Sequence, residues 1–506
     1  MADAYFKFNG TINRRDPRNE SEDFSEPVLR ENWLCRDGVL KDPGGTEKAI
    51  TTVLTDTPRW SGRYYTIETG IATPKTFIYT EDGKLWVIDD LAQTAVVVKE
   101  LLKLNGYPKH QLFKTAAQTK MFLVDGDGFY RYDGNNDNLF EKLTSTDTDG
   151  KSIAPIDVIE HKDRLWLMSR TNIYVSKNLD PETFNDATDS IVIIVGSGRG
   201  RNLAWGKLED RLYILNTQGI FVVEGDVISA LASTFEVRLV DERKIIASRS
   251  VANVERALVF LGDDYELWSW DGSESKMLSY KLKLRDFVST TGELLDKCVA
   301  TYFNNYYMLS FVEKGEIEPK VEVWWDAFED KMEIVRGRNV SCYLDIDSSE
   351  EEDFLQTGRS DIGAFMHTDR GYNFDGAAIV TKLRTRDIVV KKGHNVRFLA
   401  FYPEIQPTGN RDIAIKYLLD GRLSNPTGAE AYFDQNLQGE VKVLGFISIS
   451  NQSSFVGRVR PKINYARGES ITFDIEESTL NARKYLQGIG FDYAIKEKSK
   501  GKLVGA

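Results

Sequence analysis

The feature that most constrains this chain is a pair of short strands that recurs along its central part. Each copy has an apolar strand, a tight polar turn and a second strand with an aromatic residue near its middle. The seven aromatic residues are Trp86, Tyr130, Tyr174, Phe221, Trp268, Trp324 and Phe365. Their successive separations are 44, 44, 47, 47, 56 and 41 residues, and the longest contains a charged insertion at residues 313–320. Such a period indicates a repeat architecture.

Turn residues separate the two strands of several copies. Asp82-Gly83, the run 126–128 (Gly-Asp-Gly) and Gln218-Gly219 provide residues that accept the positive φ of tight hairpins. A period in the forties is typical of one four-stranded blade of a β-propeller. One twisted blade cannot bury both of its faces, whereas blades packed around an axis cover one another. We therefore predict a β-propeller over residues 51–374, with seven blades favoured and six or eight as alternatives.

Residues 1–50 precede the first clear hairpin and form an N-terminal arm. The segment from Asn32 to Val53 includes the sequence WLCRDGVLKDPGG. We predict that this segment supplies an outer strand to the last blade and thereby fastens the ring.

The pattern changes near Asp375, where alternating strands continue at spacings too irregular for blades. In residues 470–477 (SITFDIEE), Ile471, Phe473 and Ile475 share one face, and the polar residues between them share the other. We predict a C-terminal β-sandwich or jelly-roll-like domain over residues 375–506. Two β-sandwich domains with evenly spaced strands are the alternative to a propeller. Only short stretches, such as residues 91–104 and 478–487, are compatible with helix.

Composition restricts the classes of function. A net charge of −12 and a pI near 5.2 disfavour a protein that coats nucleic acid, because such proteins neutralise phosphates with Lys and Arg. The N-terminus has no apolar segment of a signal peptide, and apolar runs such as residues 191–195 are far shorter than the roughly 18 residues of a membrane span. We expect a soluble protein without membrane insertion. Cys35, Cys298 and Cys342 are expected to be reduced thiols packed as small apolar residues.

No metal-binding pattern emerges from the sequence. The histidines share no ligand spacing; they are His110, His161, His367 and His394. Three acidic clusters, at residues 133–137, 147–150 and 345–353, resemble parts of calcium loops but lack the glutamate at the twelfth position. Turn chemistry and solvated charge explain these clusters with fewer assumptions than structural calcium, which is the alternative, and we predict no metal and no cofactor.

Catalytic motifs are equally absent from the sequence. The Gly-rich run at residues 196–202 (GSGRGRN) precedes strand patterns rather than the helix that would hold a phosphate. The SxxK match from Ser273 to Lys276 lacks its partner motifs. We therefore predict no catalytic, cofactor-binding or metal-binding residues. The 77 acidic residues leave one enzyme alternative, a propeller glycan hydrolase or lyase with paired carboxylates at the axis.

Several segments resemble propeller-type virion proteins of tailed bacteriophages. They are residues 8–17 (FNGTINRRDP), 31–45 (ENWLCRDGVLKDPGG), 360–388 (SDIGAFMHTDRGYNFDGAAIVTKLRTRDI), 458–477 (RVRPKINYARGESITFDIEE) and 485–496 (YLQGIGFDYAIK). The chain departs from that group at Ala364 and Phe365, which stand where Val-Tyr is commoner.

The resemblance implies a non-catalytic structural protein of the tail or neck, in a nozzle or hub ring around the channel through which DNA leaves. It implies a homo-oligomeric ring, commonly sixfold, that contacts other tail or portal-adjacent proteins and meets DNA only as passing cargo. Such a protein is made in the host bacterial cytoplasm and resides in the virion.

A third alternative is an adhesion or scaffold module that binds sugar or protein on one loop face. It would expose aromatic residues there, and Trp324-Trp325 is the only adjacent Trp pair. Because side chains alternate along a strand, we expect one of these two rings to be buried.

Overall fold

The computed structural model describes residues 2–7, 11–14, 26–36, 39–68, 71–89, 92–100, 102–104, 106–115, 118–134, 140–196, 198–225, 234–346, 353–389, 396–405, 412–419, 431–435, 441–442, 455–456, 467–468, 470–478 and 485–495. The regular elements of these residues are strands, apart from η1 (Ser248–Ser250), η2 (Leu284–Asp286) and α1 (Gly292–Leu295). The protein is therefore an all-β structure, as predicted.

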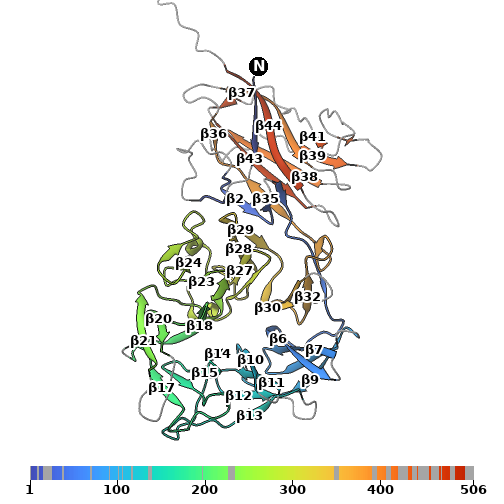
Figure 1. The fold of residues 1–506 in the computed structure, drawn as a ribbon. Coiled ribbons are helices and arrows are strands. Elements are labelled where there is room, and N and C mark those ends of the chain that lie inside the picture. Colours follow the sequence, from blue (N-terminus) through green and yellow to red (C-terminus); the bar gives the residue numbers. More distant parts are fainter. Residues whose placement is uncertain are drawn as a thin grey trace, which may run out of the picture.

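Six antiparallel units of four consecutive strands follow one another along the chain (Figure 1). The first three are β6 (Pro58–Glu68), β7 (Ile71–Thr80), β8 (Leu85–Asp89), β9 (Thr94–Lys99); β10 (Lys109–Lys114), β11 (Thr119–Val124), β12 (Phe129–Tyr132), β13 (Glu141–Leu143); and β14 (Asp157–His161), β15 (Arg164–Met168), β16 (Asn172–Val175), β17 (Ile191–Ile194). Residues 91–104, considered compatible with helix, instead contain strand β9.

The next three units have the same meander order. They are β18 (Asn202–Leu208), β19 (Arg211–Asn216), β20 (Gly219–Glu224), β21 (Glu236–Asp241); β22 (Ala252–Val254), β23 (Ala257–Leu261), β24 (Leu267–Trp270), β25 (Ser275–Met277); and β26 (Val299–Phe303), β27 (Tyr306–Phe311), β28 (Val321–Asp326), β29 (Lys331–Arg336). The charged insertion at residues 313–320 lies in the connection between β27 and β28.

The last unit is composite and closes the ring. Strands β30 (Val340–Ile346), β31 (Phe354–Arg359) and β32 (Phe365–Thr368) are joined by β5 (Thr46–Lys48) of the arm, which runs antiparallel to β32. The first strand of each unit contacts the first strand of the next, and β30 returns to β6. The fold is a β-propeller with six blades of four consecutive strands, closed by the composite unit, whereas the sequence favoured seven blades and left six as an alternative. The closing strand comes from the arm, as predicted.

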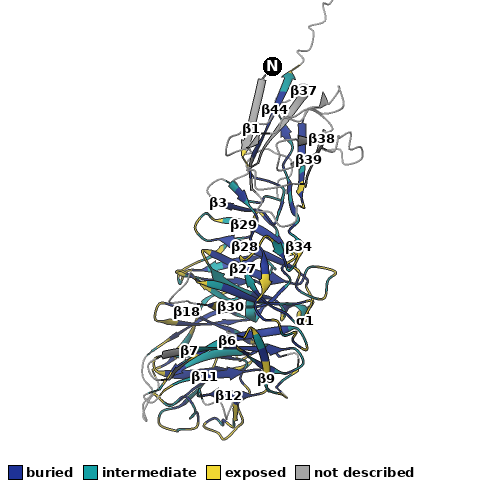
Figure 2. Cartoon of the chain, turned by 90° about the vertical axis from the view of Figure 1, so that its right-hand side faces the viewer, coloured by how far each residue is buried: buried dark blue, intermediate teal, exposed yellow. Residues whose placement is uncertain are grey.

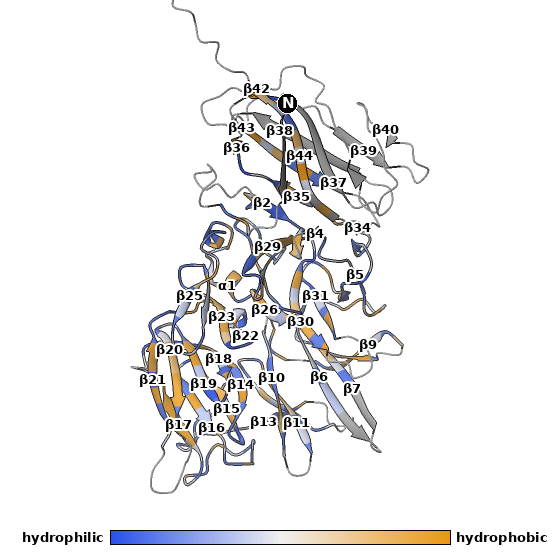
Figure 3. Cartoon of the chain, turned by 45° about the horizontal axis from the view of Figure 1, so that its top comes forward, coloured by the Kyte–Doolittle hydropathy of each residue, from blue (hydrophilic) through white to orange (hydrophobic). Residues whose placement is uncertain are grey.

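Burial explains why the repeated aromatic residues mark the blades. All seven lie on the third strand of their units and are buried. Each apolar cluster of the ring combines side chains of two neighbouring blades, as where Phe77 contacts Tyr132 edge-on with 5.2 Å between ring centroids. Hydrophobic residues accordingly run along blade strands such as β17 and β20 (Figure 3).

The expectation that only one ring of the Trp324-Trp325 pair is buried is wrong. Their exposed fractions are 5% and 8%. Trp325 packs into the cluster shared with the preceding blade, and Trp324 packs with Leu355 of the composite blade. Alternation does send the two rings to opposite faces, but neighbouring blades cover both faces.

Strand β2 (Leu29–Glu31) extends the sixth blade into a larger sheet. It runs parallel to β29 and antiparallel to β35 (Thr381–Arg384). The sheet continues through β43 (Ser470–Glu477), β38 (Asp412–Leu419), β39 (Ala431–Gln435) and β40 (Val441–Lys442), with β36 (Ile388–Val389) also pairing with β43. One hydrogen-bonded ladder thus connects the sixth blade to C-terminal strands.

A second sheet lies against this extension, beyond the rim of the ring (Figures 1 and 2). It contains β1 (Ala2–Lys7), β3 (Leu34–Arg36), β4 (Val39–Lys41), β37 (Val396–Ile405), β41 (Phe455–Val456), β42 (Arg467–Gly468) and β44 (Tyr485–Ile495). Phe473 of one sheet and Phe491 of the other lie 6.0 Å apart between ring centroids. These described strands form two packed layers.

Two details refine the expectations for this part of the chain. Asp375 lies in the turn between β33 (Asn373–Phe374) and β34 (Ala377–Ala378), a hairpin that still pairs with β5. On β43, the sequence pattern predicts a solvent-facing side for the polar residues, but Thr472 is buried, and its hydroxyl donates a hydrogen bond to Asp387. Asp474 on the same strand accepts hydrogen bonds from the Arg384 guanidinium. Residues 479–484, part of the second helix-compatible stretch, lie outside the described residues.

A buried ion pair fixes the arm to the ring. The Arg30 guanidinium on β2 donates two hydrogen bonds of 2.6 Å to the two carboxylate oxygens of Glu333 on β29. The side chains are 0% and 1% exposed, so removing one partner would leave an uncompensated charge in the interior.

We expect Arg30→Met to destabilise the protein by about 3–5 kcal/mol because Glu333 loses its counter-charge. Arg30→Met combined with Glu333→Leu should recover most of that loss, as measured by chemical unfolding. The control Arg238→Met, in an ion pair with Glu224 whose side chains are 57% and 49% exposed, should show no measurable change. Equal losses in the single and double variants would contradict a paired role.

Deleting residues 1–50 should lower the melting temperature markedly, since it removes β2 and the closing strand β5. Deleting only residues 1–7, which contain β1, should have a smaller effect because the ring stays closed. Circular dichroism at increasing temperature would measure both. An unchanged melting temperature for the longer deletion would refute closure by the arm.

Candidate functional site

The first strands of the blades surround a cavity on the ring axis. Its volume is about 320 Å³. Six of the units line it with residues on or next to their first strands, from Trp60 and Ser61 of the first to Cys342 and Tyr343 of the composite blade, and η1 with Val251 lines it ahead of the fifth. This volume lies at the small end of the range for small-molecule sites.

One carboxylate lines this cavity among the described residues, that of Asp157 at the start of β14. Its Oδ2 accepts a 2.5 Å hydrogen bond from Lys109 Nζ, and its Oδ1 accepts one of 2.8 Å from the backbone N–H of Val158. Burial raises the pKa of Asp157, and the Lys109 ammonium opposes that rise. Hydrolysis of glycosides ordinarily uses two flanking carboxylates, and this lining supplies one.

His110 and Trp60 form a coupled pair on the cavity wall. Trp60 Nε1 donates a 3.2 Å hydrogen bond to His110 Nδ1, and the rings meet edge-on at 5.1 Å. Because Nδ1 accepts, the proton of the neutral imidazole lies on Nε2. Burial lowers the pKa of His110 to about 4, so the ring is neutral at pH 7.

Arg249, in the short helix η1, also lines the cavity. Its Nη2 donates to the backbone oxygens of Arg59 at 2.7 Å and Ser341 at 3.0 Å. The guanidinium lies 4.9 Å from the ring centroid of Tyr107. Its Nη1 is buried without a hydrogen-bond partner, and burial lowers the pKa of the group. The surrounding sequence, IASRSVAN, matches no motif, and sequence reasoning missed this residue.

Paired charges lie close to this arginine. Arg59 contacts Glu81 and Glu318, the latter from the charged insertion, and Glu318 also pairs with Lys297. Burial raises the pKa of Asp296, which precedes the first strand of the sixth blade. The charged insertion therefore supplies a structural ion-pair network.

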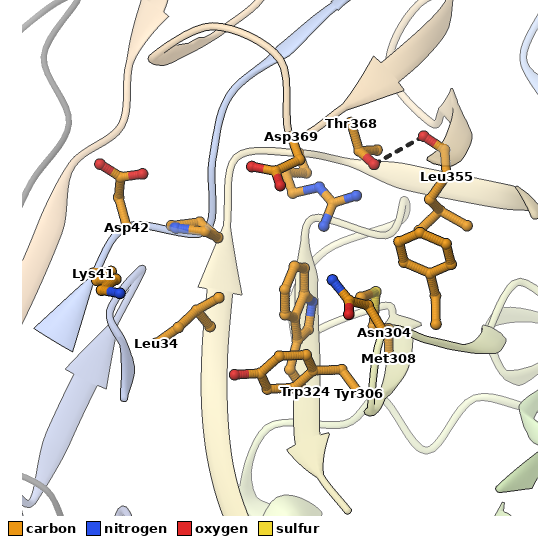
Figure 4. A pocket seen from close by; sticks show the side chains of 13 residues that line it. Leu34, Lys41, Asp42, Asn304, Tyr306, Met308, Trp324, Leu355, Thr368 and Asp369 are labelled. Carbon is orange, nitrogen blue, oxygen red and sulfur yellow. Dashed lines mark hydrogen bonds between the residues drawn. The ribbon is translucent and has the colours of Figure 1, made fainter. Parts of the chain in front are cut away.

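A smaller pocket of about 160 Å³ lies between the arm and the last two blades (Figure 4). Leu34 and Asp42 of the arm face Trp324 and Leu355 across it. Arg338, which also lines it, stacks at 5.0 Å over Trp324 and contacts Glu322 at 3.5 Å. This pocket follows the surface along which the arm packs on the ring.

The acidic and SxxK segments that are described form turns. Asp147 Oδ1 accepts hydrogen bonds from the backbone N–H groups of Asp149 and Lys151. Asp271 similarly holds Ser273 and Glu274 at the start of the SxxK match. The Gly-rich run leads into strand β18, as predicted. Residues 135–139, 347–352 and 394 lie outside the described residues.

The remaining predicted candidates do not come together. His161 lies edge-on to Trp166, whereas His367 contacts Gln356 on the composite blade. The three cysteines are buried in separate places. Within the described ranges, no group of three or more His, Cys, Asp or Glu side chains could hold a metal ion. Nor does this part of the chain contain a helix of the length and apolarity needed to cross a membrane.

Comparison with known proteins yields similarity of structure only. No known protein family matches the sequence, and no curated protein matches it. BamB from Moraxella catarrhalis is 10% identical with a TM-score of 0.37, over 66% of this chain and 92% of that chain. YCF48 bound to D1 peptide is 10% identical with a TM-score of 0.39, over 65% and 95%. BBS1N in complex with ARL6DN is 11% identical with a TM-score of 0.39, over 68% and 99%.

The lowered pKa of His110 makes the free energy of unfolding depend on pH. Its folded pKa of about 4 lies below the ordinary 6.5, so the unfolded state binds more protons between these values. The stability contributed by His110 is complete above pH 6.5 and is lost as pH falls to about 4. Unfolding free energies of the wild type should fall over this window by about 1–3 kcal/mol more than those of His110→Gln. Parallel profiles for the two proteins would contradict a neutral imidazole at this position.

Proposed function

We propose that this protein is a non-catalytic structural component of a tailed-bacteriophage virion, one subunit of a ring in the tail or neck through which DNA leaves. The sequence resemblance in the arm, the last blade and the closing strands supports the proposal. The observation that carries it is the attachment of the C-terminal strands at the rim of the propeller. The described C-terminal strands lie at that rim and not over the loop faces of the ring, so these faces can serve as platforms for neighbouring subunits.

One face has apolar side chains suited to such contacts. Val53, Leu104, Ile317 and Ile362 lie in loops at the end where the first strands of the blades begin, and they are 76%, 65%, 72% and 41% exposed. Hydrogen bonds connect the loops of Val53, Ile362 and Ile317. The backbone N–H of Leu54 donates to Gly363 O at 2.9 Å, and the Ser360 hydroxyl donates to Pro319 O at 2.5 Å. Apolar residues gathered on adjacent loops are typical of protein contacts.

Electrostatics and symmetry agree with this role. A net charge of −12 disfavours retention of DNA by a surface that it passes. When one surface of a subunit binds a different surface of the next, the repeated contact closes into a ring at the right rotation. A propeller suits the task of forming a ring subunit, because its blades cover one another and the arm strand β5 closes the ring, and both fix its shape.

Assembly of the full-length protein tests the proposal. Size-exclusion chromatography with light scattering and electron microscopy should detect rings. Val53→Asp combined with Ile317→Asp should shift the protein towards monomer by placing charge in the contact. Phe328→Asp is the matched control, since Phe328 is 86% exposed in the β28–β29 turn at the opposite face. A monomeric wild type that cleaves polysaccharide would instead favour the glycan hydrolase.

A further inference from the structure

The axial cavity contains one more positive than negative side chain among its described lining residues. Lys109 and Asp157 pair with each other, with side chains 22% and 7% exposed. Arg249 forms no ion pair in the described part of the chain, and its two printed hydrogen bonds go to neutral backbone oxygens. Arg249 interacts electrostatically with Asp296, a carboxylate that does not line the cavity. The lining itself gives the guanidinium no hydrogen-bonded counter-charge, and an anion in the cavity would supply one.

Three of the residues around the cavity have a nitrogen donor with no acceptor among the described residues. Arg249 Nη1 and Trp205 Nε1 are both buried without an acceptor. His110 adds a third donor, because its Nδ1 accepts from Trp60 and its proton therefore lies on Nε2. All three residues line the cavity. An anionic group with several lone pairs is the best hydrogen-bond acceptor for these three donors.

The remaining lining residues indicate the chemical character of the uncharged part of the ligand. Trp60, Trp205 and Tyr343 provide aromatic surface, and Val158 and Ala300 provide aliphatic surface. A volume of about 320 Å³ exceeds what a bare inorganic ion requires. An apolar or aromatic moiety can fill this space while its charged group reaches the donors.

We propose that the axial cavity binds a small organic anion, a carboxylate or a phosphate monoester, whose charged group pairs with Arg249. Arg249 supplies the charge, His110 and Trp205 supply hydrogen bonds, and the aromatic walls hold the organic part. Asp157 limits the affinity, since it places a negative charge on the same lining. This binding is independent of ring assembly and does not require the virion role.

Calorimetric titration of the full-length protein tests the site. Benzoate and phenyl phosphate are the two anionic probes, and their relative affinities distinguish a carboxylate site from a phosphate site. Benzamide is the neutral control of nearly the same shape as benzoate. At least one anion should saturate a single site and bind at least tenfold more tightly than benzamide. Equal binding of benzamide, or no saturation by either anion, overturns the proposal.

Variants separate binding from structural support by Arg249. Arg249→Gln should weaken the anion at least tenfold, Arg249→Lys should weaken it less, and the distant control Arg238→Gln should leave it unchanged. Asp157→Asn should strengthen binding, a direction that damage to the fold does not produce. Thermal melts without probe report any structural loss separately. Unchanged affinity in Arg249→Gln, or weaker binding in Asp157→Asn, refutes the assignment.

Discussion

The architecture depends on strand β2 and the ion pair beneath it. This three-residue strand hydrogen-bonds to the outer strand of the sixth blade on one side and to β35 on the other. Arg30, at its centre, is neutralised by Glu333 in the interior. Because an unpaired charge there is strongly unfavourable, the arm has one favourable register. A single ladder therefore runs from the ring axis into the C-terminal strands.

Packing between blades determines where chemistry is available. Apolar side chains fill the spaces between neighbouring blades, so polar groups gather at the axis and in the loops at the two faces. The axis holds the Arg249 guanidinium, which forms no ion pair among the described residues, together with aromatic walls, while one loop face presents exposed aliphatic residues. These features lie in different places and suit different partners, a small anion inside and a protein surface outside.

Short sequence patterns predicted the third strands of the blades and several of their turns. The repeated aromatic residues located the third strand of every blade, and glycines such as Gly83 and Gly126 adopt the positive φ that their turns require. The bridge formed by β2 was not predictable, because its partners on β29 and β35 lie far along the chain, as where Glu31 pairs with Ile334 and with Lys382. Arg249 was missed for a related reason: its neighbours come from other blades, and only the closed ring brings them together.

The use of N-terminal strands as fasteners also constrains the order in which the chain can fold. β2 and β5 leave the ribosome long before their partners, which include Ile334, Met366 and Lys382. The early blades can stack one on another as an open arc, but both ends of that arc keep bare edges until most of the chain has been made. Those edges are the surfaces where a neighbouring nascent chain could pair by mistake. Slow translation of the last third would prolong this vulnerable interval.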